Sequence, residues 1–322
     1  MVGETWSQLH LRQKLDKTTI TVLSLIAVAA VLLVIFMIYI VDRSGEQVTE
    51  IKNTKVLGPG ANLASSLSSE DDLTILNIKG ENSRHPSCTV SDGTIKEAMF
   101  HKIAQIKNLR EVSLKRCEFN GADFQIIANC PLEAIHFDDG KINEDCLRVI
   151  GRMPLLRLLE MFACDVNPHS LAHLNNSNMQ WLQLRYSQNS SGPSNFMPDQ
   201  LAVLGEMKNL KYLELERSSF APGAFRSLGK SNIVALNVER CNLTDDDIAD
   251  LVKMPKLAYL NLTRNPRVTC KGLRLLLESK TILQVSFNED ISKCGFSKAE
   301  QNKLNPKLFI IPPPLWQKFS EE

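Results

Sequence analysis

Hydrophobic and polar residues alternate in a pattern that recurs along most of the chain. A six-residue segment with apolar first, fourth and sixth positions begins at nine places: Leu73, Leu109, Leu132, Leu156, Met179, Leu210, Ile233, Leu257 and Ile282. Successive segments begin 36, 23, 24, 23, 31, 23, 24 and 25 residues apart. The alternation predicts a β-strand in each segment, and its recurrence at a nearly constant interval predicts stacked repeat units.

The segments that follow the predicted strands have the spacing of amphipathic helices. Thr244 and Asp247 form a helix-capping pattern, after which Ile248 and Leu251 share one helical face. The same reasoning predicts helices at 121–128, 144–152, 199–207, 271–278 and 297–305, and a final strand at 307–310. One unit is therefore a strand, a loop and a helix.

The strand and the loop after it fit the consensus L-x-x-L-x-L-x-x-(N/C)-x-(L/I). From about Leu73 onward the chain thus resembles leucine-rich-repeat proteins, most closely their cysteine-containing and ribonuclease-inhibitor-like classes. The resemblance implies an α/β solenoid with a curved parallel sheet on its concave side and helices on its convex side. It also implies that side chains at the N/C position hydrogen-bond neighbouring loops; this position holds Cys117, Gly140, Cys164, Ser187, Ser218, Cys241, Asn265 and Asp290. We expect local irregularity at Gly140, which has no side chain to bond.

Two spacings exceed the usual repeat length and predict insertions that form surface loops. They fall at 81–93, which contains Pro86 and Cys88, and at 188–198. Three prolines at 312–314 end the periodic pattern. We therefore predict a repeat domain at 72–311, preceded by a linker and solenoid entrance at 42–71 and followed by a C-terminal tail at 312–322.

An uncharged, apolar run lies near the N-terminus. Residues 18–41 form 24 consecutive residues without a charge, long enough as a helix to cross a hydrocarbon core of about 30 Å. Arg12, Lys14 and Lys17 precede the run closely, whereas Arg43 stands alone just after it. This favours a single transmembrane helix with residues 1–17 as a cytoplasmic tail and the repeat domain outside the cytoplasm.

Composition and motifs exclude several classes of function. The formal net charge is +1, which gives no electrostatic basis for binding nucleic acid. No phosphate-binding loop, nucleophile elbow or zinc-protease motif is present, so we predict no catalytic, cofactor-binding or metal-binding residue and no small-molecule substrate. His169 and His173 could bring two metal ligands together behind Cys164, but two solvated histidines on a helix surface are the simpler interpretation.

The eight cysteines show no C-x-x-C pair and no zinc-ligand spacing. The repeat register gives Cys117, Cys164 and Cys241 a packing role, so we expect free, buried thiols rather than disulfides. A disulfide between Cys88 and Cys130 remains an open alternative.

Strand residues between the template positions point away from the core and form the concave surface. Aromatic residues occupy this surface in the middle repeats, with acidic and amide residues around them. Exposed aromatic residues with a polar rim are enriched in protein interfaces, so we predict a partner-binding surface there. Its residues are Leu158, Glu160, Phe162, Trp181, Arg185, Tyr212, Glu214 and Tyr259. Alternatively, the rings pack laterally on one another and only stabilise the sheet.

These features together favour a membrane-anchored module that binds another protein through its concave face. The alternative is a structural or assembly subunit, in which the repeats and the transmembrane helix both join a membrane complex. An enzyme is the least favoured interpretation.

Overall fold

The computed structural model describes residues 49–51, 75–79, 86–185, 188–189, 192–193, 195–287, 291–304 and 308–309. The chain divides into two compact units, Met1–Val48 and Thr49–Glu322, and all described residues belong to the second. The predicted tail at 1–17, the predicted transmembrane run at 18–41 and the tail at 312–322 lie outside the described residues, as does most of the linker. No helix among the described residues has the length and apolar character needed to cross a membrane.

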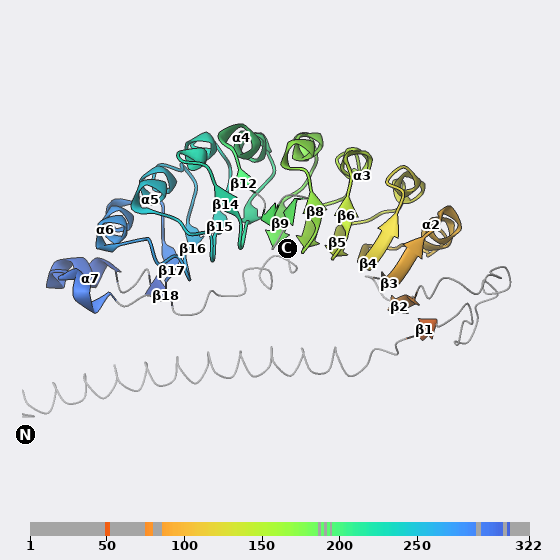
Figure 1. Cartoon of the computed structure of the whole chain (residues 1–322), viewed down its shortest axis with the longest axis horizontal. Helices are drawn as coiled ribbons and strands as arrows, with labels where there is room; N and C mark the ends of the chain where they lie inside the picture. The colour runs from red at the N-terminus through yellow and green to blue at the C-terminus, as the bar shows by residue number, and fades with distance from the viewer. Residues whose placement is uncertain are drawn as a thin grey trace, which may run out of the picture. The chain divides into compact units, whose positions relative to one another are not determined.

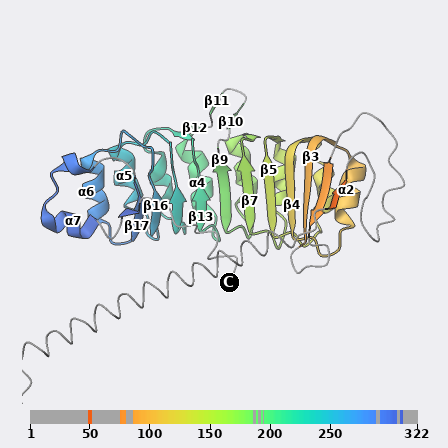
Figure 2. The same ribbon diagram turned by 90° about the horizontal axis from the view of Figure 1, so that it is seen from below.

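A twelve-stranded sheet runs through the repeat unit. Its strands, in spatial order, are β1 (Thr49–Ile51), β2 (Ile75–Lys79), β3 (Ser87–Ile95), β4 (Glu111–Phe119), β5 (Ala134–Asp138), β7 (Leu158–Phe162), β9 (Trp181–Arg185), β13 (Tyr212–Glu214), β15 (Ala235–Asn237), β16 (Tyr259–Asn261), β17 (Gln284–Ser286) and β18 (Leu308–Phe309). Pairing is antiparallel from β1 to β3 and parallel from β3 to β18. The parallel strands line the inner side of an arc (Figure 1) and run side by side across it (Figure 2).

Short helices cover the outer side of this arc (Figure 1). They are α2 (Glu97–Ala104), η1 (Asp123–Ile127), α3 (Glu144–Ile150), η2 (Pro168–Leu174), α4 (Pro198–Glu206), η3 (Ala224–Leu228), α5 (Asp245–Leu251), α6 (Cys270–Glu278), η4 (Ser292–Cys294) and α7 (Lys298–Leu304), where η marks a 3-10 helix. The predicted cap of α5 is present, because Asp247 accepts a hydrogen bond from the Thr244 backbone N–H at 2.8 Å. The predicted helix at 121–128 is instead the shorter 3-10 helix η1.

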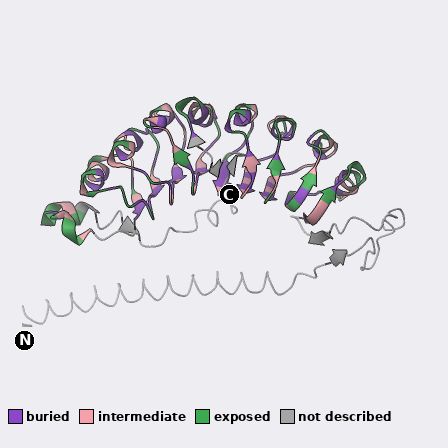
Figure 3. Cartoon of the chain, in the orientation of Figure 1, coloured by how far each residue is buried: buried purple, intermediate pink, exposed green. Residues whose placement is uncertain are grey.

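The core is one continuous layer between the sheet and the helices (Figure 3). Template leucines of adjacent strands face one another: Leu159 opposes Leu182, which opposes Leu213. Each of these three side chains is at most 1% exposed. A single unit cannot bury its apolar face alone, so stacking of neighbours stabilises the domain.

The predicted loop at 81–93 is wrong. Residues Ser87–Ile95 form β3, the first strand of the parallel series, and Cys88 and Val90 are fully buried at the template positions. They oppose Val112 and Leu114 of β4, and Cys88 lies 24 residues before Val112, which is one normal repeat. A buried thiol packs as a small apolar side chain, so cysteine replaced the expected leucine.

The second insertion, at 188–198, adds short strands outside the main sheet. β10 (Gln188–Asn189) pairs with β11 (Gly192–Pro193) and with β8 (Asp165–Val166), which pairs in turn with β6 (Lys141–Ile142). β12 (Asn195–Phe196) pairs with β14 (Ser219–Phe220). The Phe196 side chain is 1% exposed and stacks on Phe220 with a centroid distance of 5.8 Å. One end of this insertion is therefore anchored in the core rather than lying on the surface.

The side chains of Asn265 and Cys241 at the N/C position bond neighbouring loops as expected, whereas the buried Ser218 hydroxyl at the same position has no hydrogen-bond partner. Asn265 donates to the carbonyls of Val238 (2.8 Å) and Leu262 (3.0 Å), and its oxygen accepts from the Cys241 backbone N–H at 3.0 Å. The Cys241 thiol donates to the Leu215 carbonyl at 3.0 Å. These bonds tie consecutive repeats together at the level where each strand ends.

The expected irregularity at Gly140 does not occur. The residue before the N/C position has a positive φ in several repeats, including Asp139 (56°), Ala163 (54°) and Arg240 (56°). Its backbone N–H donates to the next repeat, from Asp139 to the Phe162 carbonyl and from Ala163 to the Arg185 carbonyl, both at 2.9 Å. Because this ladder uses only backbone atoms, it continues past a glycine.

One disulfide is present among the described residues. Cys270 at the start of α6 is bonded to Cys294 at the end of η4, with Cα atoms 5.2 Å apart. The expectation of free thiols is therefore wrong for this pair, which adjacent repeats bring to the same level. It is confirmed for Cys117, Cys164 and Cys241, and Cys88 and Cys130 are also unbonded.

Candidate functional site

The predicted partner-binding residues all lie on strands of the concave sheet. They are Leu158, Glu160 and Phe162 on β7, Trp181 and Arg185 on β9, Tyr212 and Glu214 on β13, and Tyr259 on β16. The pairing confirms the predicted register, because Tyr212 opposes Trp181 on one side and Ala235 on the other, and Ala235 opposes Tyr259.

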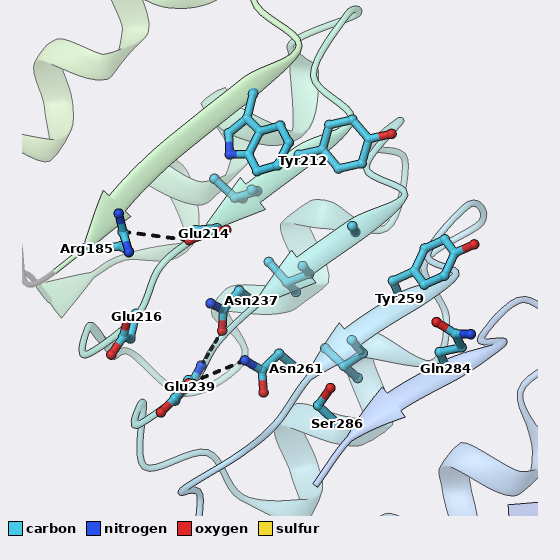
Figure 4. A pocket seen from close by; sticks show the side chains of 15 residues that line it. Arg185, Tyr212, Glu214, Glu216, Asn237, Glu239, Tyr259, Asn261, Gln284 and Ser286 are labelled. Atoms are coloured by element: carbon cyan, nitrogen blue, oxygen red, sulfur yellow. Dashed lines mark hydrogen bonds and ion pairs between the residues drawn. The ribbon is translucent and has the colours of Figure 1, made fainter. Parts of the chain in front are cut away.

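A groove lies over the strands from β9 to β17 (Figure 4). Its volume is about 230 Å³. Five of the eight predicted residues line it, whereas Leu158, Glu160 and Phe162 on β7 do not. The lining residues outside the predicted set include Glu216, Ala235, Asn237, Glu239, Asn261 and Gln284. The repeat register predicts that these residues lie on the concave face, but it does not show which of them line the groove.

A single small residue creates the space within this groove. Ala235 stands between Tyr212 and Tyr259 in the same row of the sheet, and its side chain is 6% exposed. Tyr212 and Tyr259 are intermediate in exposure. Adjacent strands are about 4.8 Å apart, so the two tyrosines are separated by roughly 10 Å with only a methyl group at the floor between them.

Trp181 is buried, contrary to the expectation that it is exposed. Its side chain is 6% exposed, and its ring lies against that of Tyr212 with a centroid distance of 4.9 Å. In the amide orientation that satisfies both neighbours, Gln183 accepts from the Trp181 Nε1–H at 2.7 Å and donates to Glu160 Oε1 at 2.9 Å. Lateral packing of the rings therefore describes the Trp181–Tyr212 pair, and Trp181 forms one wall of the groove.

Glu160 belongs to an internal network beside the groove. Its carboxylate bonds His136 Nδ1 at 2.8 Å and pairs with the Arg185 guanidinium, which lies 5.7 Å from the centroid of the Phe162 ring. Burial raises the pKa of Glu160, but the His136 bond and Arg185 outweigh that effect and bring it down to about 2. The protein itself thus satisfies this carboxylate.

Glu214 lies in a different environment although it occupies the same row. Its side chain is 14% exposed, and the nearest arginine nitrogen, Arg185 Nε, is 3.8 Å from Glu214 Oε2, beyond hydrogen-bond distance. Burial raises the pKa of Glu214 to about 7, and the charges of Glu160 and Glu216 add to this effect, whereas Arg185 and a hydrogen bond with the Asn237 side chain oppose it. At neutral pH this carboxylate is thus balanced between its neutral and charged forms.

The charges that line the groove are mostly negative. Arg185 is the one cationic side chain in the lining, against Glu214, Glu216 and Glu239. Arg264 approaches from outside the groove, with its Nη1 3.3 Å from Glu239 Oε1, and the Asn261 amide donates to Glu239 Oε2 at 3.4 Å. Three carboxylates and one guanidinium give the lining a net negative charge.

The two histidines considered as metal ligands lie on η2, away from the groove. His173 Nε2 bonds Glu144 Oε1 at 2.9 Å, and His169 Nε2 lies 3.1 Å from the Gln200 amide nitrogen. Within the described part of the chain, no group of three or more histidine, cysteine, aspartate and glutamate side chains is arranged to hold a metal ion. Each histidine instead has a partner on an adjacent helix.

The parallel sheet, the outer helices and the asparagine–cysteine ladder define the fold as a leucine-rich-repeat solenoid. No family model matches the sequence, and no curated protein matches it. Similar solved structures include an internalin (inlF) of Listeria monocytogenes, with 16% identity, a TM-score of 0.44 and coverage of 59% of this chain and 51% of that one. Internalin C2 of the same organism has 18% identity, a TM-score of 0.42 and coverage of 62% and 80%.

A third similar structure is the Toll–Spatzle complex of Drosophila. The matched chain has 11% identity and a TM-score of 0.47, and the match covers 74% of this chain and 33% of that one. The present chain thus spans about half the length of the inlF internalin and a third of the chain in the complex.

Proposed function

We propose that this protein is a binding module whose concave groove holds a segment of a protein partner. The observation that carries the proposal is the groove itself, bounded by two partly exposed tyrosines and lined by carboxylates. Tyrosine supplies a large contact area and is enriched at the energetic centres of protein interfaces. A solenoid adds a continuous surface on which a longer segment can lie.

We assign the groove no catalytic step. Its polar lining, among the described residues, consists of glutamate, asparagine, glutamine, serine, tyrosine and one arginine, without histidine or cysteine. Ser286 is buried, at 5% exposure, and the lining offers it no histidine as a general base. Nucleophilic catalysis needs such a base within hydrogen-bond reach.

We further propose that residues 18–41 anchor the chain in a membrane and that the repeat domain lies outside the cytoplasm. The uncharged 24-residue run supports the anchor, and the cations that precede it support the orientation. The Cys270–Cys294 disulfide also supports the orientation, because disulfides persist in oxidising compartments. The other cysteines are mostly buried, which protects their thiols from oxidation.

A photocrosslinking experiment tests the binding function. The full chain carries a benzophenone amino acid in place of Tyr212 in living cells, with a matched control at Asp246, which is exposed on α5. We expect a protein adduct at position 212 that is absent at position 246 and is lost when Tyr259→Ala is added. Identical adducts at both positions, or none at position 212 in a folded chain, would overturn the proposal.

Chemical extraction and thiol counting test the anchor and its orientation. Alkaline carbonate should leave the full chain in the membrane fraction, and release of the chain would refute the anchor. Alkylation of the denatured chain before reduction should label the six unbonded cysteines and spare Cys270 and Cys294. Labelling of all eight would remove the support that the disulfide gives to the orientation.

A further inference from the structure

The groove has an aromatic end and an acidic end. Tyr212 and Tyr259 stand at the starts of β13 and β16, and Glu216 and Glu239 lie just beyond the ends of β13 and β15 (Figure 4). Two residues along a parallel strand span about 6.6 Å, so Glu214 lies roughly that far from the tyrosine row. This distance matches the aliphatic part of a long side chain laid along the strands.

The protein satisfies the acidic end only in part, because Arg264 and Asn261 contact Glu239 while Glu214 has no arginine nitrogen within hydrogen-bond distance. The floor between the two tyrosines is the methyl group of Ala235, and the Arg185 guanidinium that could neutralise Glu214 is paired with Glu160. The Asn237 amide oxygen is occupied by the Glu239 backbone N–H at 3.0 Å. The groove therefore combines a narrow apolar slot with a negative charge that its own arginine neutralises only in part.

We propose that this slot receives one lysine or arginine side chain of the partner, with its stem between Tyr212 and Tyr259 over Ala235 and its cationic head at Glu214 and Glu239. The inference rests on the proposed function and specifies the chemistry that the groove recognises. The tyrosine rings offer an apolar surface for the stem, and charge-assisted hydrogen bonds from the head to carboxylates are about twice as strong as neutral ones. A long cationic side chain can place its stem on apolar surface and its head among polar groups.

Other occupants fit this chemistry less well. A fully apolar side chain would shield Glu214 from water without offering it a hydrogen-bond donor, which costs free energy. An acidic side chain would add a like charge to a lining that is already negative. A cation is the occupant that satisfies both ends of the slot.

Protonation of Glu214 provides a signature for this mode of binding. The charged groups around it are Arg185 on β9, Glu160 on β7, Glu216 after β13 and Glu239 after β15. Because burial raises its pKa to about 7, a cation that needs the charged form must displace a proton at lower pH. Affinity for the cation should therefore rise with pH between about 6 and 8.

The test uses the full chain in nanodiscs of zwitterionic phosphatidylcholine, which do not attract cations. The probe is a fluorescent peptide of Gly-Ser-Lys repeats, compared with the same peptide after acetylation of its lysines. We expect acetylation to weaken binding at least about tenfold, measured by fluorescence anisotropy. Equal binding of the acetylated peptide, or no binding of either peptide, would overturn the proposal.

Two variants show whether the cation occupies the slot. Ala235→Leu fills the space between the tyrosines without changing any charge, and Ala172→Leu on η2, where Ala172 is exposed, is the matched control. We expect at least a tenfold loss for Ala235→Leu and none for the control. If a folded Ala235→Leu chain still binds the peptide, the cation binds elsewhere, and the proposal that it occupies the slot is wrong.

Glu214→Gln provides a second route that does not depend on Ala235→Leu folding. This variant should weaken binding and abolish the pH dependence between about 6 and 8. An unchanged pH dependence would contradict the assigned role of Glu214. If position 212 still crosslinks to a protein while the lysine peptide fails, the inference about the cation fails and the proposed function stands.

Discussion

Two glutamates of the concave sheet differ sharply although their sequence positions are equivalent. Glu160 on β7 and Glu214 on β13 occupy the same row, with only β9 between them. Their side chains are 21% and 14% exposed, so both are largely withdrawn from water. Yet the pKa of Glu160 is about 2 and that of Glu214 about 7.

The partners of the two carboxylates explain the difference. His136 and Arg185 both bind Glu160, and this leaves Arg185 too far from Glu214 for a hydrogen bond. Arg185 lies between the two glutamates and pairs with Glu160, so the carboxylate on β7 has a charged hydrogen-bond partner and the carboxylate on β13, in the groove, has none. A carboxylate on the concave face is open to an external partner where the protein itself supplies no charged hydrogen-bond donor.

The largest expected effect concerns the buried template leucines, which lie beneath both regions of the sheet, around Glu160 and around Glu214. Leu159→Asp under the first region and Leu213→Asp under the groove should each lower the free energy of unfolding by about 5 kcal/mol or more, because a charge replaces a buried side chain. Urea denaturation followed by circular dichroism measures both. Leu213→Met, which keeps the volume, should change little. A stable Leu213→Asp chain would refute the register of β13.

We expect Trp181 to contribute mainly to the stability of the fold and Tyr259 mainly to the binding of the partner. Trp181→Ala should cost about 3 kcal/mol of stability, since the ring is buried and hydrogen-bonded. Tyr259→Ala should cost under about 1 kcal/mol, because the ring is partly exposed, and should weaken partner binding instead. Denaturation midpoints and crosslinking yields decide this together. Equal losses of stability in Trp181→Ala and Tyr259→Ala would contradict the different roles assigned to the two side chains.

Stability should depend on pH with opposite signs for the two glutamates. The lowered pKa of Glu160 gives stability that is present above about pH 4.5 and lost toward pH 2. The raised pKa of Glu214 gives stability that is present below about pH 4.5 and lost as pH rises through 7. Glu214→Gln should remove the second loss, with a gain of at most about 3 kcal/mol above pH 7. A gain independent of pH would contradict this.

A change at Glu160 isolates the network that it forms with His136 and Arg185. Glu160→Gln keeps the shape of the side chain but removes its charge, and should cost about 2 kcal/mol at neutral pH, the contribution of hydrogen bonds to a charged group. Because this variant frees Arg185, it should also lower the pKa of Glu214. Nuclear magnetic resonance titration of the glutamate side chains measures that shift. An unchanged Glu214 would show that the two regions are independent.

The sequence by itself determined the repeat, the strand register and the set of concave-face residues. Side-chain alternation in a strand and the recurrence of leucine leave one register that buries the template positions. The sequence pattern did not identify β3, because Cys88 occupies a template position in place of leucine. The antiparallel start of the sheet was likewise not expected, because the sequence showed it only as a spacing of 36 residues, which is twelve more than the 24 residues of one repeat.

Tertiary structure alone decided which concave-face residues form a site. Trp181 is buried because Tyr212 and Gln183 cover it, and Ala235 creates a slot because tyrosines stand on both sides. The Cys270–Cys294 disulfide depends on adjacent repeats bringing the two residues to one level. Apart from Gln183, the neighbours involved lie 23 or more residues away in the sequence, and a pattern within one repeat carries no information about them.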